Sequence, residues 1–342
     1  MRIAIDAMGG DHAPAEIVAG AVRAARDLAV EVVLVGPDER IRAELAYHRF
    51  PDPRVRVVHA AQVIEMHESP TTALRRKPDN SITRALELVR SGQADAFFSA
   101  GNTGAAMAAA LFTLGRIEGV DRPAIAAVLP NLTGRMVLID VGANVDCKPR
   151  HLLQFALMAS VYAERVLGIP SPRLGLLSNG EEATKGNDLV LRAGELLRAT
   201  DLNYIGHVEG RDVFFGKADV LVCDGFVGNV LLKLGEGMAL ALFRIIREEV
   251  RRSTRAKLAA WLLRPRLRAF QRRVDYIEYG GAPLLGVRGV CVIGHGSSDA
   301  RAVYNAVCVA QDSVRQRIVD TIHEEMRRLS AAASSADALT ST

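Results

Sequence analysis

Cysteine, aromatic residues and long apolar runs are all scarce in this sequence. The four cysteines lie far apart, at positions 147, 223, 291 and 308, and form no C-x-x-C pair, so neither a disulfide framework nor a cysteine metal site is indicated. Aromatic residues are 5% of the 342 residues, although 49% are hydrophobic. No apolar run approaches the roughly 20 residues of a membrane span, and Asp6 follows the N-terminus too closely for a signal peptide. We therefore expect a protein of the reducing cytoplasm that is soluble or at most lies on a membrane surface.

Three motifs of nucleotide and hydrolase sites are also missing. The turn at residues 8–11, Met-Gly-Gly-Asp, is not G-x-G-x-x-G, which disfavours a Rossmann dinucleotide site. Residues 210–218 resemble a Walker A loop but have one spacer residue too many and end in Ala. Ser297 follows Gly-His-Gly without the trailing Gly of a nucleophile elbow. Cys147 lies beside Lys148, yet a lone Cys in such a loop is more often inert.

Strand and helix patterns alternate along nearly the whole chain. This alternation predicts an α/β protein with helices on both faces of the sheet. From residue 331 onward the Ala, Ser and Thr content predicts a disordered tail, residues 331–342. The expected strands are residues 3–5, 31–35, 55–59, 94–98, 124–129, 136–141, 173–177, 203–207, 220–223 and 289–293. The expected helices are residues 15–27, 39–46, 81–90, 105–114, 152–167, 189–198 and 299–328.

The chain is organised around residues 97–107, a predicted strand, turn and helix. Helix N-termini leave backbone N–H groups without partners and carry partial positive charge. Glycines in the turn let an anion approach, while Ser99, Asn102 and Thr103 add donors or cap the helix. The turn fits a phosphate or oxyanion cradle, and an ordinary capped βα turn explains it equally well.

Five predicted strands end in loops rich in Gly, Asn and Asp, and these loops also hold Lys185 and His295. Ligands of open α/β sheets bind outside the carboxyl ends of the strands. One such loop is more often only a turn, but five at equivalent positions indicate one shared site. The sequence therefore predicts an anion-binding site that needs no nucleotide, no metal and no protein nucleophile.

Six motifs resemble those of the PlsX-type phosphate acyltransferases of bacterial phospholipid synthesis. They occur in order over nearly the whole chain up to about Arg328, and they are IDAMGGDHAP (5–14), SAGNTGA (99–105), DVGANVDCKP (140–149), LSNGEEATKGN (177–187), CDGFVGNVLLK (223–233) and YGGAPLLGVRGVCVIGHGSS (279–298). The resemblance implies transfer of a long-chain acyl group from acyl carrier protein to inorganic phosphate, without a cofactor. It also implies a homodimer and a three-layer α/β/α sandwich with a mostly parallel or mixed sheet, similar to phosphotransacetylases and isocitrate dehydrogenases.

Phosphate would be the nucleophile in this reaction, so the protein has to bind a dianion and stabilise an oxyanion. We expect Lys185 and Asn229 to stabilise charge, and His295 either to protonate the leaving thiolate or to brace its loop. No metal site is expected. The expected phosphate- and substrate-binding residues are Asp6, Gly9, Gly10, Asp11, His12, Ser99, Gly101, Asn102, Thr103, Gly104, Asn144, Asn179 and Asp224.

Residues 244–273 are rich in arginine, and apolar residues recur there at helical spacing. We expect Pro265 to break this segment into two helices joined by the apolar turn Trp261-Leu262-Leu263. Such a hairpin suits an anionic membrane surface, the acidic acyl carrier protein or a dimer interface, and these alternatives stay open. The expected contact residues are Arg252, Arg255, Lys257, Trp261, Leu262, Leu263 and Arg264.

The sequence thus predicts one α/β/α catalytic domain, residues 1–330, with a helical hairpin inserted at about 236–275. We expect it in the cytoplasm, peripherally associated with the inner face of the membrane. The alternative functions are a short-chain phosphotransacetylase-like enzyme, a decarboxylating dehydrogenase, and a non-catalytic protein that binds membranes or nucleic acid. A nucleic-acid partner is not expected, because it would leave the five polar loops unexplained.

Overall fold

The computed structural model describes residues 1–274 and 280–340, and the side chains of these except 268–274 and 332–340. Eleven strands form one mixed sheet in the order β3-β2-β1-β4-β11-β10-β5-β6-β9-β7-β8. They are β1 (Arg2–Asp6), β2 (Glu31–Gly36), β3 (Val55–His59), β4 (Ala96–Ser99), β5 (Ala124–Asn131), β6 (Gly134–Ile139), β7 (Leu174–Ser178), β8 (Tyr204–Glu209), β9 (Val220–Val222), β10 (Ala282–Leu285) and β11 (Val290–Ile293).

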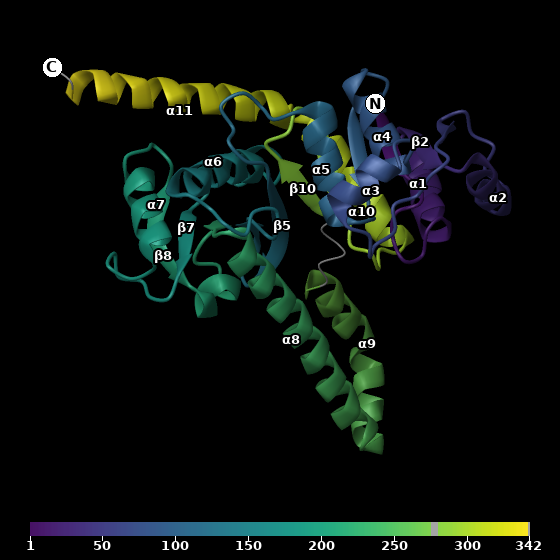
Figure 1. Ribbon diagram of the computed structural model, residues 1–342. Coiled ribbons are helices and arrows are strands. Elements are labelled where there is room, and N and C mark those ends of the chain that lie inside the picture. Colours follow the sequence, from purple (N-terminus) through teal and green to yellow (C-terminus); the bar gives the residue numbers. More distant parts are fainter. Residues whose placement is uncertain (275–279, 341–342) are drawn as a thin grey trace.

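Helices cover both faces of this sheet, which completes the expected three layers (Figure 1). One face carries α1 (Ala15–Asp27), α2 (Asp38–His48), α6 (Pro149–Arg165), α7 (Asp188–Arg198), α10 (Ala300–Arg315) and α11 (Ile318–Thr340). The other face carries α3 (Pro70–Arg76), α4 (Ser81–Arg90), α5 (Thr103–Leu114), the 3-10 helix η1 (Gly210–Phe215) and the start of α8 (Gly225–Arg251).

The alternation of side chains along the central strands explains the two cores. In β1, Ile3 and Ile5 face the layer of α1 and α10, whereas Ala4 faces the layer of α4 and α5. All three side chains are fully buried. Strands buried on both faces read as continuous apolar runs, and this is why the sequence pattern located most of them.

Strand direction changes within the sheet, between β5 and β6. Strands β1, β2, β3, β4 and β11 are mutually parallel, and β5 runs the same way. Strands β6, β9, β7 and β8 are parallel to each other, but β6 is antiparallel to β5. Strands β6, β7 and β9 therefore run opposite to β1, β4 and β11. The expected single edge of parallel strands is therefore wrong, but the loops still meet in part, because Val141 after β6 and Asn229 after β9 line one cavity with Thr103 after β4 and His295 after β11.

Strand β10 is the bridge between the two halves of the sheet, β3-β2-β1-β4-β11 and β5-β6-β9-β7-β8. Its first two residues, Ala282 and Pro283, pair with β11, and its last two, Leu284 and Leu285, pair with β5. The remainder of β5 pairs only with β6, so a gap opens between β5 and β11. This gap becomes the cleft described below.

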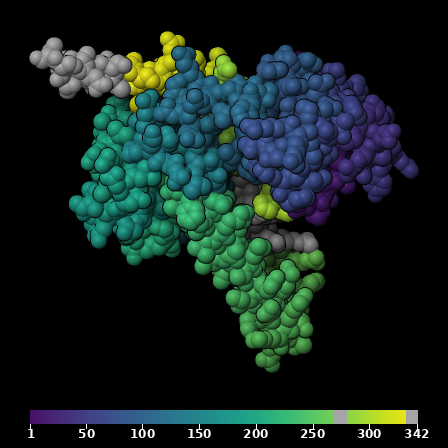
Figure 2. Space-filling view, in the orientation of Figure 1, coloured from purple at the N-terminus to yellow at the C-terminus, as the bar shows by residue number. Residues whose placement is uncertain are grey.

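The hairpin stands out from the body of the molecule, as both views show (Figures 1 and 2). It consists of α8 and α9 (Thr254–Val274), which contact each other and meet at the tip of the hairpin (Figure 1). The turn between them is at Arg252 and Ser253, so the expected apolar turn at 261–263 is wrong. Ser253 accepts a hydrogen bond from the N–H of Ala256 at 3.3 Å and starts α9 as its N-cap, while Pro265 lies inside the helix.

Helix α8 also corrects the expectation drawn from apolar runs. Among the described residues it is the one helix whose length and composition would let it cross a membrane, with a mean hydropathy of 1.5 over 18 residues. Only 6% of that window is buried in the protein. One such helix is weak evidence of a span, but it shows that the chain carries an extended apolar surface.

The C-terminal region differs from the sequence expectation in two ways. The single helix expected at 299–328 is two helices, α10 and α11, separated at Gln316 and Arg317, where Arg317 has a φ of 51°. Helix α11 also continues to Thr340, where a disordered tail was expected from residue 331. Alanine, abundant in this stretch, has the highest helix propensity of all residues.

Candidate active site

A cleft of about 210 Å³ lies where the two halves of the sheet separate. Its floor is apolar and includes Ile125, Ala127 and Leu129 of β5. Its polar lining comes from three places, namely the N-terminus of α5, the start of α8 and the loop after β11. These polar residues are Thr103, Asn229, Lys233, Glu236, His295, Ser297 and Ser298.

A buried carboxylate holds the turn at the N-terminus of α5. Asp6 ends β1 and is 1% exposed, and it accepts hydrogen bonds from the Ser99 hydroxyl at 2.7 Å and the Met8 N–H at 3.1 Å. Ser99 Oγ in turn accepts from the N–H of Gly101 at 3.0 Å. Burial raises the pKa of Asp6, although these hydrogen bonds oppose the change. We therefore expect Asp6 and Ser99 to shape the turn and not to touch an anion.

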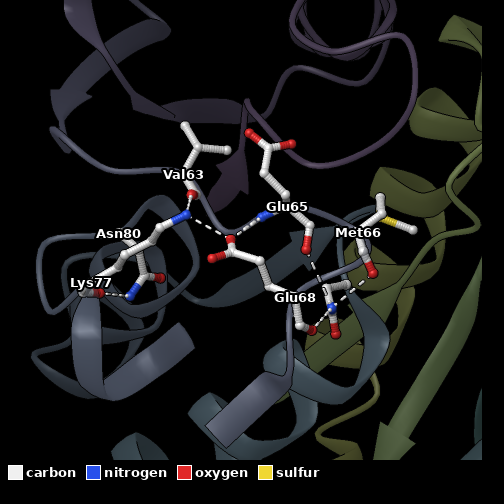
Figure 3. A network of polar contacts seen from close by, with 7 residues as sticks. Val63, Glu65, Met66, Glu68, Lys77 and Asn80 are labelled. Atoms are coloured by element: carbon white, nitrogen blue, oxygen red, sulfur yellow. Dashed lines mark hydrogen bonds and ion pairs between the residues drawn. The ribbon is translucent and has the colours of Figure 1, made fainter. Parts of the chain in front are cut away.

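The side-chain amide of Asn102 is likewise engaged in hydrogen bonds within the protein. Its Oδ1 accepts from the N–H of Ala105 at 3.0 Å and caps α5, while its Nδ2 donates to the carbonyls of Met66 at 3.0 Å and Glu68 at 2.9 Å. Those carbonyls belong to a loop held by Lys77, whose ammonium lies 2.6 Å from both Glu68 Oε2 and the Val63 carbonyl (Figure 3). This network fixes the wall of the cleft beside the start of α5.

The backbone N–H groups of Thr103 and Gly104 are the donors that remain for a ligand at the N-terminus of α5. Among the described residues, their backbone N–H groups have no hydrogen-bond partner, as expected for the first turn of a helix. Thr103 is exposed and lines the cleft. Gly104 packs so closely on Pro70 that a Cβ would lie 2.6 Å from its Cγ, so only glycine fits here.

The loop after β1 packs against both neighbouring loops, as the sequence predicted. A Cβ on Gly9 would lie 2.6 Å from the backbone N of Gly101. Gly10 has a φ of 111°, which favours glycine. The Asp11 N–H donates to the Gly296 carbonyl at 2.7 Å. Asp11 and His12 are exposed, so the three loops after β1, β4 and β11 form one continuous surface.

A second buried carboxylate organises the other half of the site. Asp140 follows β6 and accepts from the Asn144 N–H at 2.7 Å and Nδ2 at 2.9 Å, and burial raises its pKa. Asn144 Nδ2 also donates to the Pro123 carbonyl, so both of its N–H groups are engaged. Asp224 accepts from the N–H groups of Phe226 and Val227 and caps α8. Asn144 and Asp224 thus hold the start of α8, and their expected contact with substrate stays a prediction.

Helix α8 presents three polar side chains to the cleft, at Asn229, Lys233 and Glu236. The Lys233 ammonium lies 2.9 Å from Glu236 Oε2 and 3.5 Å from His295 Nε2. Only Asn229 was expected from the sequence. The spacing i, i+4, i+7 puts all three on one helix face, and this signal would have found Lys233 and Glu236.

His295 joins the cleft from the loop after β11. Its Nδ1 lies 2.7 Å from Ser297 Oγ, and the Ser297 N–H points to the same nitrogen at 3.2 Å. The ring is exposed to the cleft and is oriented by its own loop. This placement is compatible with both expected roles, bracing and proton transfer.

Lys185 and Asn179 do not line the described cavity. Both are exposed on the loop after β7, a strand that is parallel to its neighbour β9. The Lys185 N–H donates to the Glu182 carbonyl at 3.0 Å, and His207 Nδ1 lies 3.0 Å from the same oxygen. The loop is thus anchored to β8, and the roles of Lys185 and Asn179 stay predictions.

The cysteines are poor nucleophiles in this fold. Burial raises the pKa of Cys147 to about 12, with Asp140 and Asp224 acting in the same direction, and burial also raises the pKa of Cys291 to about 12. Cys223 is buried beside Asp140, and its pKa is also raised. Among the described residues, no three His, Cys, Asp or Glu side chains gather as a metal site would require.

Comparison with known proteins agrees with this architecture. A model of the family described as fatty acid synthesis protein matches residues 1–321. The chain belongs to this family. Phosphate acyltransferases from Pelotomaculum thermopropionicum and Heliobacterium modesticaldum are both 56% identical to this member, over 329 and 327 residues. The alignments cover 96% and 95% of this chain and 96% and 98% of theirs, which confirms the resemblance stated from the motifs.

Solved structures confirm the expected fold of this family member. A phosphotransacetylase from Streptococcus pyogenes aligns with a TM-score of 0.66 at 16% identity, covering 92% of this chain and 94% of its own. A branched-chain phosphotransacylase from Enterococcus faecalis V583 aligns with a TM-score of 0.58 at 17% identity, covering 92% and 99%. At such identities the likeness concerns the fold alone.

Proposed function

We propose that the protein transfers a long-chain fatty acyl group from acyl carrier protein to inorganic phosphate, giving acyl phosphate for phospholipid synthesis. The observation that carries this proposal is the cleft in which the N-terminus of α5 faces Asn229 and His295. Such a helix end binds anions through its free N–H groups and its dipole. The relatives that carry the name phosphate acyltransferase support the same reaction.

The proposed reaction needs no protein nucleophile. A phosphate oxygen attacks the thioester carbonyl carbon, the carbonyl electron pair moves to oxygen, and collapse of this oxyanion breaks the C–S bond. The N–H groups of Thr103 and Gly104 hold the phosphate, and the Asn229 amide donates to the oxyanion. His295 gives the departing thiolate its proton, which completes acyl phosphate and free carrier thiol. The raised pKa values of the cysteines support this division of roles.

Lys185 and Asn179 belong to this proposal as contacts supplied by the loop after β7. The loop is rich in small and polar residues and exposed over most of its length. Lys185 would add positive charge for the phosphate or for the phosphopantetheine arm of the carrier. Its exposure suits contact with a large, incoming partner.

We also propose that the hairpin of α8 and α9 contacts an anionic membrane from the cytoplasmic side. Trp261 and Leu262 are 66% and 65% exposed on α9, beside Arg255 and Lys257. Exposed aromatic and apolar residues with interspersed cations bind anionic lipid surfaces. The apolar residues of α8 nearer the body, such as Val230 and Leu234, suit pairing with a second copy, as in the proposed homodimer.

The test is phosphate-dependent release of carrier thiol from palmitoyl-acyl carrier protein, with hydroxylamine trapping of acyl phosphate. We expect thiol release only with phosphate, together with trapped product. Release without phosphate would identify a thioesterase instead. Acetyl-CoA in place of the palmitoyl carrier separates a short-chain phosphotransacetylase, which the fold likeness alone also permits. No release with either donor contradicts the proposed function.

A further inference from the structure

Lys233 places a permanently charged ammonium in the cleft. Of the described residues that line the cavity, it is the only Lys or Arg, and it shares that lining with Thr103, Asn229 and His295. A helix N-terminus supplies only about half of a unit charge, whereas phosphate near neutral pH carries between one and two. The α5 end alone therefore leaves much of the anion's charge without compensation.

The geometry around Lys233 aims its ammonium across the cleft. Its Nζ lies 2.9 Å from Glu236 Oε2 on the same helix and 3.5 Å from His295 Nε2 on the opposite wall. The Glu236 side chain is only 17% exposed, while that of Lys233 is 49% exposed. A largely buried carboxylate thus holds a solvent-accessible ammonium at the point where the two halves of the sheet face each other.

We propose that Lys233 is a further catalytic residue, which binds the attacking phosphate together with the N-terminus of α5. The ammonium contacts a phosphate oxygen, while Glu236 acts as a positioning residue that holds the lysine in the cleft. Asn229, one turn earlier on the same helix face, then lies on the side of the thioester carbonyl. This inference rests on the proposed function, because it assigns a residue to the phosphate of that reaction.

A purely structural role for Lys233 predicts something different. Surface ion pairs of this i, i+3 kind stabilise a helix by only about 0.2–0.5 kcal/mol and do not affect ligand binding. Arg84 and Glu87 form such a pair on α4, at 3.1 Å and outside the cleft. Arg84→Met is therefore the matched control for Lys233→Met.

The experiment compares Lys233→Met, Lys233→Arg and Arg84→Met with the wild type in two assays. The first measures the rise of Tm with inorganic phosphate, which reports binding without turnover. The second measures kcat/KM for phosphate with palmitoyl-acyl carrier protein. We expect Lys233→Met to abolish the phosphate-dependent rise and to lower kcat/KM about 10- to 100-fold, as for loss of a charged hydrogen bond. Lys233→Arg should restore part of both, and Arg84→Met should stay within about twofold of the wild type.

The two hypotheses fail in different ways. If Lys233→Met keeps both the phosphate-dependent rise of Tm and the wild-type kcat/KM, Lys233 does not bind phosphate and the inference is overturned. If the wild type shows no rise of Tm with phosphate, the inference is overturned as well. If the rise is present and lost in Lys233→Met, but no acyl phosphate forms with any donor, the phosphate site is supported and the proposed acyl transfer is contradicted.

Discussion

Gly9 lies where the turns after β1 and β4 touch, and replacing it with alanine tests how strictly that contact positions the site. A Cβ at this position would lie 2.5 Å from Asp6 Oδ2 and 2.6 Å from the backbone N of Gly101. Neither neighbour is the free end of a flexible side chain, because Asp6 is held by Ser99 and Met8. The two turns must therefore move apart.

The size of that movement follows from the distances. Ordinary contacts of a Cβ begin at 3.4 Å, so the α5 turn has to shift by about 0.8 Å. A misplacement of about 1 Å can cost a catalytic site about 100-fold. Overpacking of this kind also lowers the free energy of unfolding by about 1–3 kcal/mol. We expect Gly9→Ala to lose about 10- to 100-fold in kcat/KM for phosphate, measured by thiol release at a temperature where circular dichroism shows the variant folded.

Gly237→Ala is the matched control. Gly237 lies within α8, and a Cβ there would have no neighbour within 4 Å. Alanine should raise the stability of the helix by about 0.5–1 kcal/mol and leave turnover unchanged. The reasoning is refuted if folded Gly9→Ala retains the kcat/KM of the wild type.

Three further predictions concern pH, the proposed site and the hairpin. Burial raises the pKa of Asp6 above 3.8, so the native state holds a proton that the unfolded chain has lost, and wild-type stability falls as pH rises from 3.8 toward the native pKa. Asp6→Asn lacks this dependence. The free energy of unfolding of the wild type minus that of Asp6→Asn should therefore decline by up to about 1.4 kcal/mol per pH unit in that window. Urea titrations at several pH values measure this difference, and a flat or rising difference contradicts the prediction. Asn229→Ala should lower kcat about 100- to 1,000-fold, as for an oxyanion donor, and Lys185→Ala should lower kcat/KM; normal turnover of both folded variants removes the assignment. Trp261 emission should shift to the blue with anionic vesicles and not with zwitterionic ones; neither a shift nor co-sedimentation with anionic vesicles rules out membrane contact.

The sequence predicted the layers of the fold because its signals were local. Apolar runs such as residues 31–35 and 136–141 belong to strands that are buried on both faces, and Asn102 and Asp224 cap α5 and α8 as such residues do. The loops around Gly9, Ser99 and His295 also meet as expected.

The features that were missed depend on tertiary structure. Nothing in the pattern of residues 136–141 indicates that β6 runs against β5, so the change of strand direction in the middle of the sheet was missed. Strand β10 is only four residues long and contains Pro283, so it gives no periodic signal. In the hairpin, Pro265 and Ser253 are both residues that can mark the end or start of a helix. The turn is at Ser253, the N-cap of α9, whereas Pro265 lies inside that helix.

The short bridge formed by β10 determines how the two sides of the sheet are joined. Its four residues divide evenly between two partners, and the change of partner falls at the peptide that joins Pro283 to Leu284. Each of these two pairings comprises only two residue pairs, fewer than between any other neighbouring strands of the sheet. The cleft therefore lies where the least backbone pairing joins the two sides of the eleven-stranded sheet.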